Sequence, residues 1–374
     1  MSRKRVLYVI DSLRRFGATR QLDLLTKILA TEFDVHVAVL DLANTAPAIL
    51  VPEDDPRTFH FLASEEPVST LRSLSKSGLR LRKLIQRLEP DVLHAWCQRA
   101  ERVALLAAIE FKSLKRFATE LYLRPPSRMV SKAIDGRLAG ALEKVVASHD
   151  EVKKSLLEDG YPEQKIAIIA NGFESHEINR TDARRKLIDR CRYGEDVYLF
   201  GAVAELEPPS RLKDLIWATD LLTCIRDDVH FFIFGSGSQR ERLQRFAYQT
   251  EAGDHVHFVE NECDALELIP GLDAFWHSHL NEPLPSVMCH AMSSEVPVIS
   301  VYGSGTSELI DHQESAFATN LGARDEFARW SKFLLEKPDQ SQQLAEQGRQ
   351  AIGSKYPAGQ MVAAYRELYA GAGA

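Results

Sequence analysis

The stretch NEPLPSVMCHAMSSEVPVIS, residues 281–300, brings an acid close to the start of a predicted helix. Glu282 lies in the loop before this helix, and Pro285 suits the first helical turn. The N–H groups near Ser286 have no partners inside the helix, so this helix end attracts anions such as phosphate. His290 follows Glu282 by eight residues, and a neutral histidine offers one hydrogen-bond donor and one acceptor. The segment indicates a site for a phosphate-bearing ligand, with His290 as either a ligand contact or a packed helix residue.

Two glycine-containing turns follow strand-like segments. Gly235 and Gly237 come after VHFFIF, and Gly303 and Gly305 come after PVISVY. Because glycine has no Cβ, it lets a ligand approach the backbone closely, but it is also a common turn residue. Both interpretations stay open from the residues alone.

Alternating strands and helices must position these residues. The run RVLYVIDSL is short, continuous and apolar, as expected for a strand buried on both faces of a parallel sheet. The next segment has Leu22, Leu25 and Leu29 at helical spacing, and the alternation continues along the chain. This pattern predicts an α/β fold with doubly wound parallel sheets.

A polar, charged segment at residues 175–195 interrupts the alternation. We place the linker and the first helix of a second domain there. The predicted units are residues 1–175, residues 195–355 and a C-terminal helical segment, 356–374. Two Rossmann-like halves facing each other predict a ligand site in the central cleft between them.

The composition excludes several classes of function. The net charge of −7 argues against a nucleic-acid-binding protein, although residues 1–175 alone carry 27 basic and 23 acidic residues, a net of +4. Five scattered cysteines predict a reduced, cytoplasmic protein, and the first apolar run is too short for a signal peptide. His277 and His279 lack a nearby third ligand, so no metal is expected.

A basic segment at residues 71–88, LRSLSKSGLRLRKLIQRL, has its leucines on one face of a predicted helix. Such a helix could lie on anionic lipid at the inner face of a membrane, or take an anionic or lipid-linked acceptor. The alternative is an ordinary solvated surface helix.

Several segments together resemble glycosyltransferase family 4, the group 1 glycosyl transferases, which are retaining enzymes of GT-B fold. The resemblance covers nearly the whole chain and rests on the order and spacing of the segments. They are VLYVIDSLRRFGATRQLDLL, DVLHAW, VVASHDEVKKSLLEDGYPEQKIAIIANGFE, FIFGSGSQRERL, GSGTSELI and YPAGQMVAAYRELY. The resemblance implies an acceptor-side first domain, a donor-binding second domain and a last helix that crosses back to the first. It also implies a nucleotide-sugar donor and no bound metal or cofactor.

The same resemblance assigns site residues. Glu282 and His94 would be catalytic, although His94, predicted at the end of the strand DVLHAW, could instead be a buried structural histidine. The implied donor-binding residues are Gly17, Arg211, Gly235, Gly237, Leu284, Pro285, Ser286, His290, Gly305, Thr306 and Glu308.

Four positions depart from the family pattern. Phe16 replaces the first glycine of a Gly-Gly pair, Glu205 and Ser210 replace the arginine and lysine of a basic clamp, and His290 replaces a second glutamate. Without a metal, the leaving diphosphate needs cations and N–H groups, and each lost contact of that kind costs about 3–4 kcal/mol. Arg211 could supply one such cation through a one-residue shift of its loop, or could be a solvated residue of the first helical turn.

Two functions therefore stay open. The first is an enzyme that transfers a hexose-type sugar from a nucleotide sugar to an unknown acceptor with retention. The second is a catalytically inactive pseudo-enzyme that binds a glycan or a partner protein. The glycine turns, Glu282 and Glu308 favour the first, and the four departures favour the second.

Overall fold

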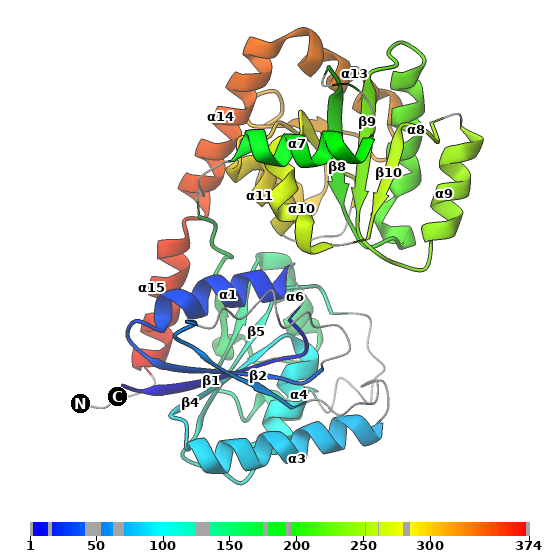
Figure 1. Ribbon diagram of the computed structural model, residues 1–374. Helices are drawn as coiled ribbons and strands as arrows, with labels where there is room; N and C mark the ends of the chain where they lie inside the picture. The colour runs from blue at the N-terminus through cyan, green and yellow to red at the C-terminus, as the bar shows by residue number, and fades with distance from the viewer. Residues whose placement is uncertain are drawn as a thin grey trace. The chain divides into compact units, whose positions relative to one another are not determined.

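The computed structural model describes most of the 374 residues. The described ranges are 3–13, 17–41, 54–62, 71–124, 135–174, 179–191, 194, 196–250, 252–260, 262–279 and 285–371, without the side chains of 71–75, 262–264 and 304. The chain forms two compact units (Figure 1), Met1–Gly172 with Ala358–Ala374, and Phe173–Pro357. Phe16, Glu282 and Leu284, which the sequence singled out, lie outside the described residues.

Unit 1 is built on a parallel sheet with strand order β3-β2-β1-β4-β5-β6-β7. Its strands are β1 (Arg5–Ile10), β2 (Asp34–Val39), β3 (Thr58–Phe61), β4 (Val92–Trp96), β5 (Lys115–Glu120), β6 (Lys144–Ala147) and β7 (Ile166–Ile168). Its helices are α1 (Ala18–Leu29), α3 (Leu71–Leu88), α4 (Gln98–Ala107), α6 (Asp150–Glu158), the 3-10 turn η1 (Glu163–Lys165) and α15 (Ala358–Gly371).

Two apolar cores cover the faces of this sheet. On one face α3, α4 and α6 bury residues such as Leu81, Val103 and Leu156. On the other face α1 buries Leu22, Leu25 and Leu29, as their helical spacing predicts, beside the last helix, α15. The end of the chain is therefore part of the core of unit 1.

Unit 2 repeats this plan with the parallel strand order β10-β9-β8-β11-β12-β13. Its strands are β8 (Tyr198–Val203), β9 (Val229–Phe234), β10 (Val256–Val259), β11 (Ala274–His277), β12 (Val298–Val301) and β13 (Phe317–Thr319). Its helices and 3-10 turns are α7 (Arg180–Cys191), η2 (Pro208–Ser210), α8 (Leu212–Thr223), α9 (Arg240–Gln249), α10 (Glu262–Leu268), η3 (Ile269–Gly271), α11 (Ser286–Ser293), α12 (Ser304–Ser307), α13 (Arg324–Glu336) and α14 (Pro338–Lys355).

Both sheets have the strand order of doubly wound folds, which confirms the predicted fold class. The order reverses between β1 and β4 in unit 1 and between β8 and β11 in unit 2. Ligands of such sheets bind beyond the carboxyl ends of the strands at the point of reversal. In the described part of the chain, no helix is both long and apolar enough to cross a membrane.

Candidate functional site at the carboxyl edge of unit 2

The loops that follow β8, β9, β11 and β12 share one edge of the unit 2 sheet, because these strands are parallel. The loop after β8 runs along the turn after β9. Leu206 N–H donates to the Ser236 carbonyl at 2.9 Å, and Gln239 N–H donates to the Leu206 carbonyl at 2.9 Å. The two segments therefore form a single packed rim at the strand reversal.

The glycines of the turn after β9 make this packing possible. A Cβ on Gly235 would lie 2.0 Å from the Ala204 carbonyl oxygen, and one on Gly237 would lie 2.7 Å from that of Leu206. Neither separation is sterically allowed, so glycine is required at both positions. The neighbouring loop accounts for this requirement without a ligand.

Glu207 binds the turn before α9 on the same rim. Its carboxylate accepts hydrogen bonds from Ser238 N–H at 2.7 Å and from Ser238 Oγ–H at 2.8 Å. These two bonds, chiefly the backbone one, lower the pKa of Glu207 below its ordinary value. A side-chain anion thus already binds the turn that leads into α9.

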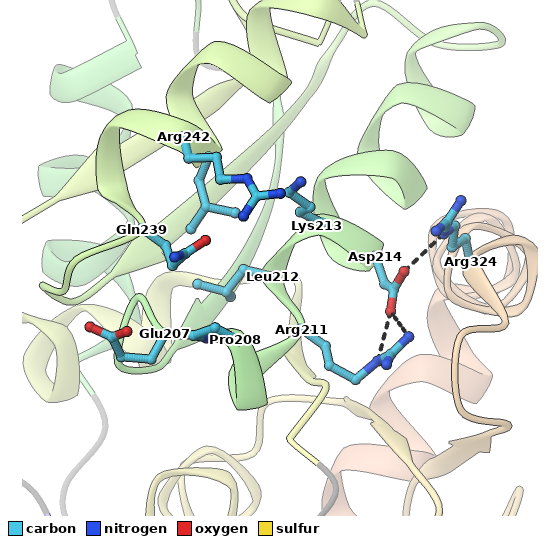
Figure 2. Close-up of a pocket in the computed structure, with 10 residues that line it drawn as sticks. Glu207, Pro208, Arg211, Leu212, Lys213, Asp214, Gln239, Arg242 and Arg324 are labelled. Atoms are coloured by element: carbon cyan, nitrogen blue, oxygen red, sulfur yellow. Dashed lines mark hydrogen bonds and ion pairs between the residues drawn. The ribbon is translucent and has the colours of Figure 1, made fainter.

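Arg211 has a left-handed backbone, with φ of 51°, directly before α8. Its guanidinium binds the carboxylate of Asp214, with Nε 2.8 Å from Oδ2, and Asp214 Oδ1 accepts from Arg324 Nε at 2.9 Å. Figure 2 shows this arginine–aspartate–arginine bridge on one side of a cavity of about 280 Å³, with Lys213 and Arg242 on the other side. Four basic and two acidic side chains line the cavity, which makes it net positive.

Glu205 and Ser210, the two predicted clamp positions, have different surroundings. Ser210 is only 4% exposed, and its carbonyl accepts from Ser278 Oγ–H at 2.6 Å. Glu205 is exposed on the loop after β8. At this rim the carboxylate of Glu205 is therefore exposed, whereas Ser210 is buried.

The helix α11 begins at Ser286, one residue later than predicted, and Pro285 directly precedes it. Both residues are buried, and the Pro285 carbonyl accepts from Cys289 N–H at 3.0 Å. His290 is 7% exposed, and its Nε2–H donates to the Leu266 carbonyl at 3.1 Å. This contact matches the alternative in which His290 is a packed helix residue.

The remaining predicted residues lie in the short helix α12 or directly after it. Thr306 is 2% exposed, and its Oγ1 accepts from Gly303 N–H at 2.9 Å and donates to the Val301 carbonyl at 2.9 Å. Gly305 is buried beside it, whereas Glu308 is exposed. Thr306 thus ties the turn to the end of β12, and Glu308 is the residue of this group that presents a side chain at the surface.

The first glycine loop lies in unit 1. Gly17 has φ 53° and ψ −114°, and a Cβ there would lie 1.8 Å from the Tyr122 hydroxyl oxygen. That oxygen accepts from Ala18 N–H at 2.9 Å, at the start of α1. The tyrosine therefore occupies the space that the missing side chain of Gly17 leaves.

His94 lies in the middle of β4 and not at its end, so the predicted position is wrong. The side chain has no exposed surface. Its Nδ1 lies 2.6 Å from the Tyr369 hydroxyl and its Nε2 lies 2.8 Å from Thr119 Oγ1. Burial lowers the pKa of His94 to about 3, so the ring is neutral. These are the contacts of a structural histidine, since a substrate could not reach this ring.

Sequence patterns missed a buried ionic cluster beyond the carboxyl ends of the unit 1 strands. Arg124 is 8% exposed and donates to Glu120 at 2.9 Å, to Glu101, and to the Tyr161 hydroxyl at 2.8 Å. Burial raises the pKa of Glu120 to about 7, with a further contribution from the charge of Glu101. Glu120 and Arg124 are four residues apart, but Glu101 and Tyr161 come from distant segments, and the one available signal was an acid, Glu120, at the end of a buried strand.

The fold defines the class of this protein. It is a two-domain α/β protein with parallel sheets, and in each sheet the strand order reverses at a position where such folds bind ligands. Solved structures of GT-B glycosyltransferases share this fold. The Alr3699/HepE protein of Anabaena, in complex with UDP and glucose, matches with a TM-score of 0.83 at 18% identity, over 98% of this chain and 100% of that one. WaaG, a glycosyltransferase involved in lipopolysaccharide biosynthesis, matches with a TM-score of 0.71 at 13% identity, over 98% and 100%.

Two family models match the chain. The model "Glycosyltransferase Family 4" matches residues 17–177, and "Glycosyl transferases group 1" matches residues 184–351. The chain belongs to the group 1 family of glycosyl transferases, as the sequence motifs predicted.

Two curated relatives extend this assignment. The lipopolysaccharide core biosynthesis glycosyltransferase LpsE of Rhizobium meliloti (strain 1021) is 23% identical over 295 residues, 78% of this chain and 79% of its own. The UDP-Gal:alpha-D-GlcNAc-diphosphoundecaprenol alpha-1,3-galactosyltransferase of Escherichia coli is 22% identical over 312 residues, 79% of this chain and 78% of its own.

Proposed function

We propose that this protein transfers a hexose-type sugar from a nucleotide-sugar donor to a glycan or lipid-linked acceptor, with retention of configuration. The observation that carries the proposal is the carboxyl edge of unit 2. There the start of α11 and the turns after β8, β9 and β12 lie at the strand reversal where such sheets bind nucleotides. In the proposed site Glu308 lies beside the donor sugar, and Glu282, outside the described residues, keeps the catalytic role that the family resemblance implies.

The donor and acceptor classes come from relatives. The HepE structures contain UDP with glucose, or UDP-glucose. The two curated relatives are named for lipopolysaccharide core synthesis and for a UDP-galactose reaction on a diphosphoundecaprenol acceptor. We infer a nucleotide-sugar donor and an acceptor that carries a saccharide or a phosphate.

The main requirement on this site is to stabilise the negative charge that develops on the leaving diphosphate. Arg211 directly follows Ser210 in the chain, and in the structure Asp214 holds it. In our proposal Arg211 exchanges Asp214 for the donor phosphate, while Arg324 keeps Asp214 neutralised from its other oxygen. A charge-assisted contact of this kind contributes about 1.5–3 kcal/mol.

A second candidate is a binding protein without transferase activity. It is favoured by the acids on the rim, because Glu205 is exposed and Glu207 already binds the Ser238 N–H in the turn before α9. A carboxylate within contact distance of a diphosphate opposes binding by about 1–4 kcal/mol, depending on the local dielectric.

Calorimetry with UDP and GDP, followed by assays with a panel of nucleotide sugars, separates the two candidates. The transferase predicts nucleotide binding tighter than about 1 mM, the upper end of ordinary substrate constants, and product of retained anomeric configuration by NMR. Absence of binding and of transfer across the panel would eliminate the enzyme.

Two variants test the site itself. Arg211→Ala should weaken nucleotide binding about tenfold to a hundredfold if Arg211 meets the phosphate, whereas Arg242→Ala, on the far side of the cavity, should have little effect. The double variant Glu205→Arg with Ser210→Lys should change turnover little if the native site is competent. A large gain in turnover would show that the native donor site is impaired.

A further inference from the structure

A cysteine and two histidines come together on the other side of unit 2, away from the carboxyl-edge rim. Cys191 ends α7, His230 lies in β9, and His257 lies in the edge strand β10. One ligand atom from each lies within 4.8 Å of the other two. Figure 1 shows α7 lying across the face of the sheet that includes β9 and β10.

The cluster is built into the core and is not a surface coincidence. Cys191 is 5% exposed and His230 is fully buried. His230 Nδ1 and His257 Nε2 are 3.0 Å apart, so the two rings share one hydrogen bond. The ring of Phe232 stacks on His257 at 4.9 Å, and the ring of His255 stacks on His230 at 5.4 Å. These neighbours pack against both imidazoles.

The ligand types fit a borderline-soft transition metal. Thiolate and imidazole are the usual ligands of zinc, whereas calcium and magnesium require oxygen ligands. Zinc bound to sulfur and nitrogen at ordinary lengths separates its ligand atoms by roughly 3.4–3.7 Å. The three ligand atoms are already within 4.8 Å, so small side-chain rotations suffice.

We propose that Cys191, His230 and His257 form a zinc site that joins the end of α7 to the strands β9 and β10. The fourth tetrahedral position is taken by water. This site is separate from the proposed donor site and does not depend on catalysis.

An approach from solvent exists beside the cluster. A surface cavity of about 910 Å³ is lined by His257 and by Arg190, the neighbour of Cys191. Tyr248, which is 83% exposed, also lines this cavity. A hydrated ion can therefore reach His257 without unfolding of the sheet.

Binding must rearrange two protons. The Cys191 thiol, whose Sγ–H now donates to the Leu187 carbonyl at 3.5 Å, releases its proton to solvent and binds the ion as thiolate. The hydrogen bond between His230 and His257 breaks, and its proton moves to the ring nitrogen that does not bind the metal. One proton leaves the protein for each ion bound.

The test uses the full chain without a histidine tag, stripped with a chelator and titrated with Co²⁺. The expected result is one Co²⁺ per chain, with the sulfur-to-metal charge-transfer band of a thiolate ligand, displaced by one equivalent of Zn²⁺. Zn²⁺ should also raise the melting temperature, because it binds the folded state selectively.

Two ligand variants and one matched control complete the experiment. Cys191→Ser should remove the thiolate band, and Cys191→Ser and His257→Asn should each weaken binding about a hundredfold or more. Cys224→Ser changes an exposed cysteine of the same unit and should keep both band and affinity. Melting curves in chelator check that each variant is folded. Wild-type binding no tighter than that of folded Cys191→Ser or His257→Asn, or a band lost in Cys224→Ser, would overturn the site.

Discussion

At the scale of single residues, side chains from distant segments fill the space that glycine leaves and satisfy buried polar groups. Gly17 and Tyr122 are the clearest pair. The hydroxyl of Tyr122 takes the space above Gly17 and accepts from Ala18 N–H. The Ala18 carbonyl in turn accepts from Trp96 Nε1–H at 2.8 Å. Two aromatic residues from other segments thus hold the start of α1: Tyr122, which follows β5, and Trp96, which ends β4.

Gly17→Ala should destabilise unit 1 by about 2–3 kcal/mol. The backbone at φ 53° and ψ −114° is a glycine conformation, and its use by another residue costs about 1–3 kcal/mol. The new Cβ must also displace the Tyr122 hydroxyl. Urea denaturation measures the loss. In a Tyr122→Ala background the same change should cost less, and an equal cost in both backgrounds would show that Tyr122 does not fill this space.

Glu120 should make stability depend on pH. Its pKa is raised to about 7 from the ordinary 4.5, mainly by burial, so the folded state keeps this proton to higher pH than the unfolded chain. The stabilisation is fully present below about pH 4.5 and is lost as the pH rises through 7. We expect the unfolding free energy of wild type, relative to Glu120→Gln, to fall by about 1–3 kcal/mol between pH 5 and pH 8.

Urea denaturation across this range provides the measurement. Glu143→Gln changes an exposed glutamate of the same unit and should give a pH curve parallel to wild type. A constant difference between wild type and Glu120→Gln would mean that Glu120 does not titrate in this interval.

At the scale of elements, α3 combines an apolar face with a basic one. Leu81, Leu84 and Ile85 are buried against the sheet, and Lys76, Arg80, Arg82, Lys83 and Arg87 are exposed. Arg82 pairs with Glu110, and Arg80 Nη1–H donates to the Leu62 carbonyl at 3.0 Å. Leu79 is 60% exposed on this basic surface. We propose that α3 contacts anionic membrane lipid.

Replacement of Lys76, Lys83 and Arg87 by glutamine should weaken binding to phosphatidylglycerol vesicles about a hundredfold. Each basic residue near an anionic surface contributes about 1 kcal/mol. Vesicle cosedimentation at low and high salt measures the effect. The matched control replaces Arg329, Lys332 and Lys337 by glutamine. These three residues are exposed on α13 or directly after it. Equal binding of the two triple variants would exclude α3 as the contact.

Element periodicity was enough to predict the fold, because buried strands and amphipathic helices are local patterns. Leu22, Leu25 and Leu29 lie on the buried face of α1 as their spacing predicts. The contacts of the candidate site residues, in contrast, involve segments that are distant along the sequence. His94 is buried by Tyr369 from the far end of the chain, and Asp214, which holds Arg211, also accepts from Arg324, 110 residues further on. Spacing along the sequence cannot show which side chains are already bound to one another in the folded protein.

At the scale of the whole molecule, the chain crosses between units and returns. Its last helix, α15, belongs to unit 1. Tyr369 Oη lies 2.9 Å from the Tyr8 hydroxyl and 2.6 Å from His94 Nδ1, and Tyr365 Oη lies 2.9 Å from Thr119 Oγ1. Strands β1, β4 and β5 thus depend on the final residues of the chain for their buried polar partners.

Unit 1 should therefore fail to fold stably when residues 358–374 are removed, whereas unit 2, Phe173–Pro357, should keep its own cooperative transition. Removal of α15 exposes apolar core residues and leaves the His94 ring and the Tyr8 hydroxyl without the Tyr369 hydroxyl as partner.

Tyr369→Phe is the milder test: it keeps the ring but removes both hydrogen bonds, at about 1–3 kcal/mol for the buried groups left unsatisfied. Calorimetry should show the loss only in the unit 1 transition, and Tyr248→Phe, at an exposed tyrosine of unit 2, should change neither transition. If the truncated chain still unfolds in two transitions like those of wild type, α15 is dispensable and the core of unit 1 is complete without it.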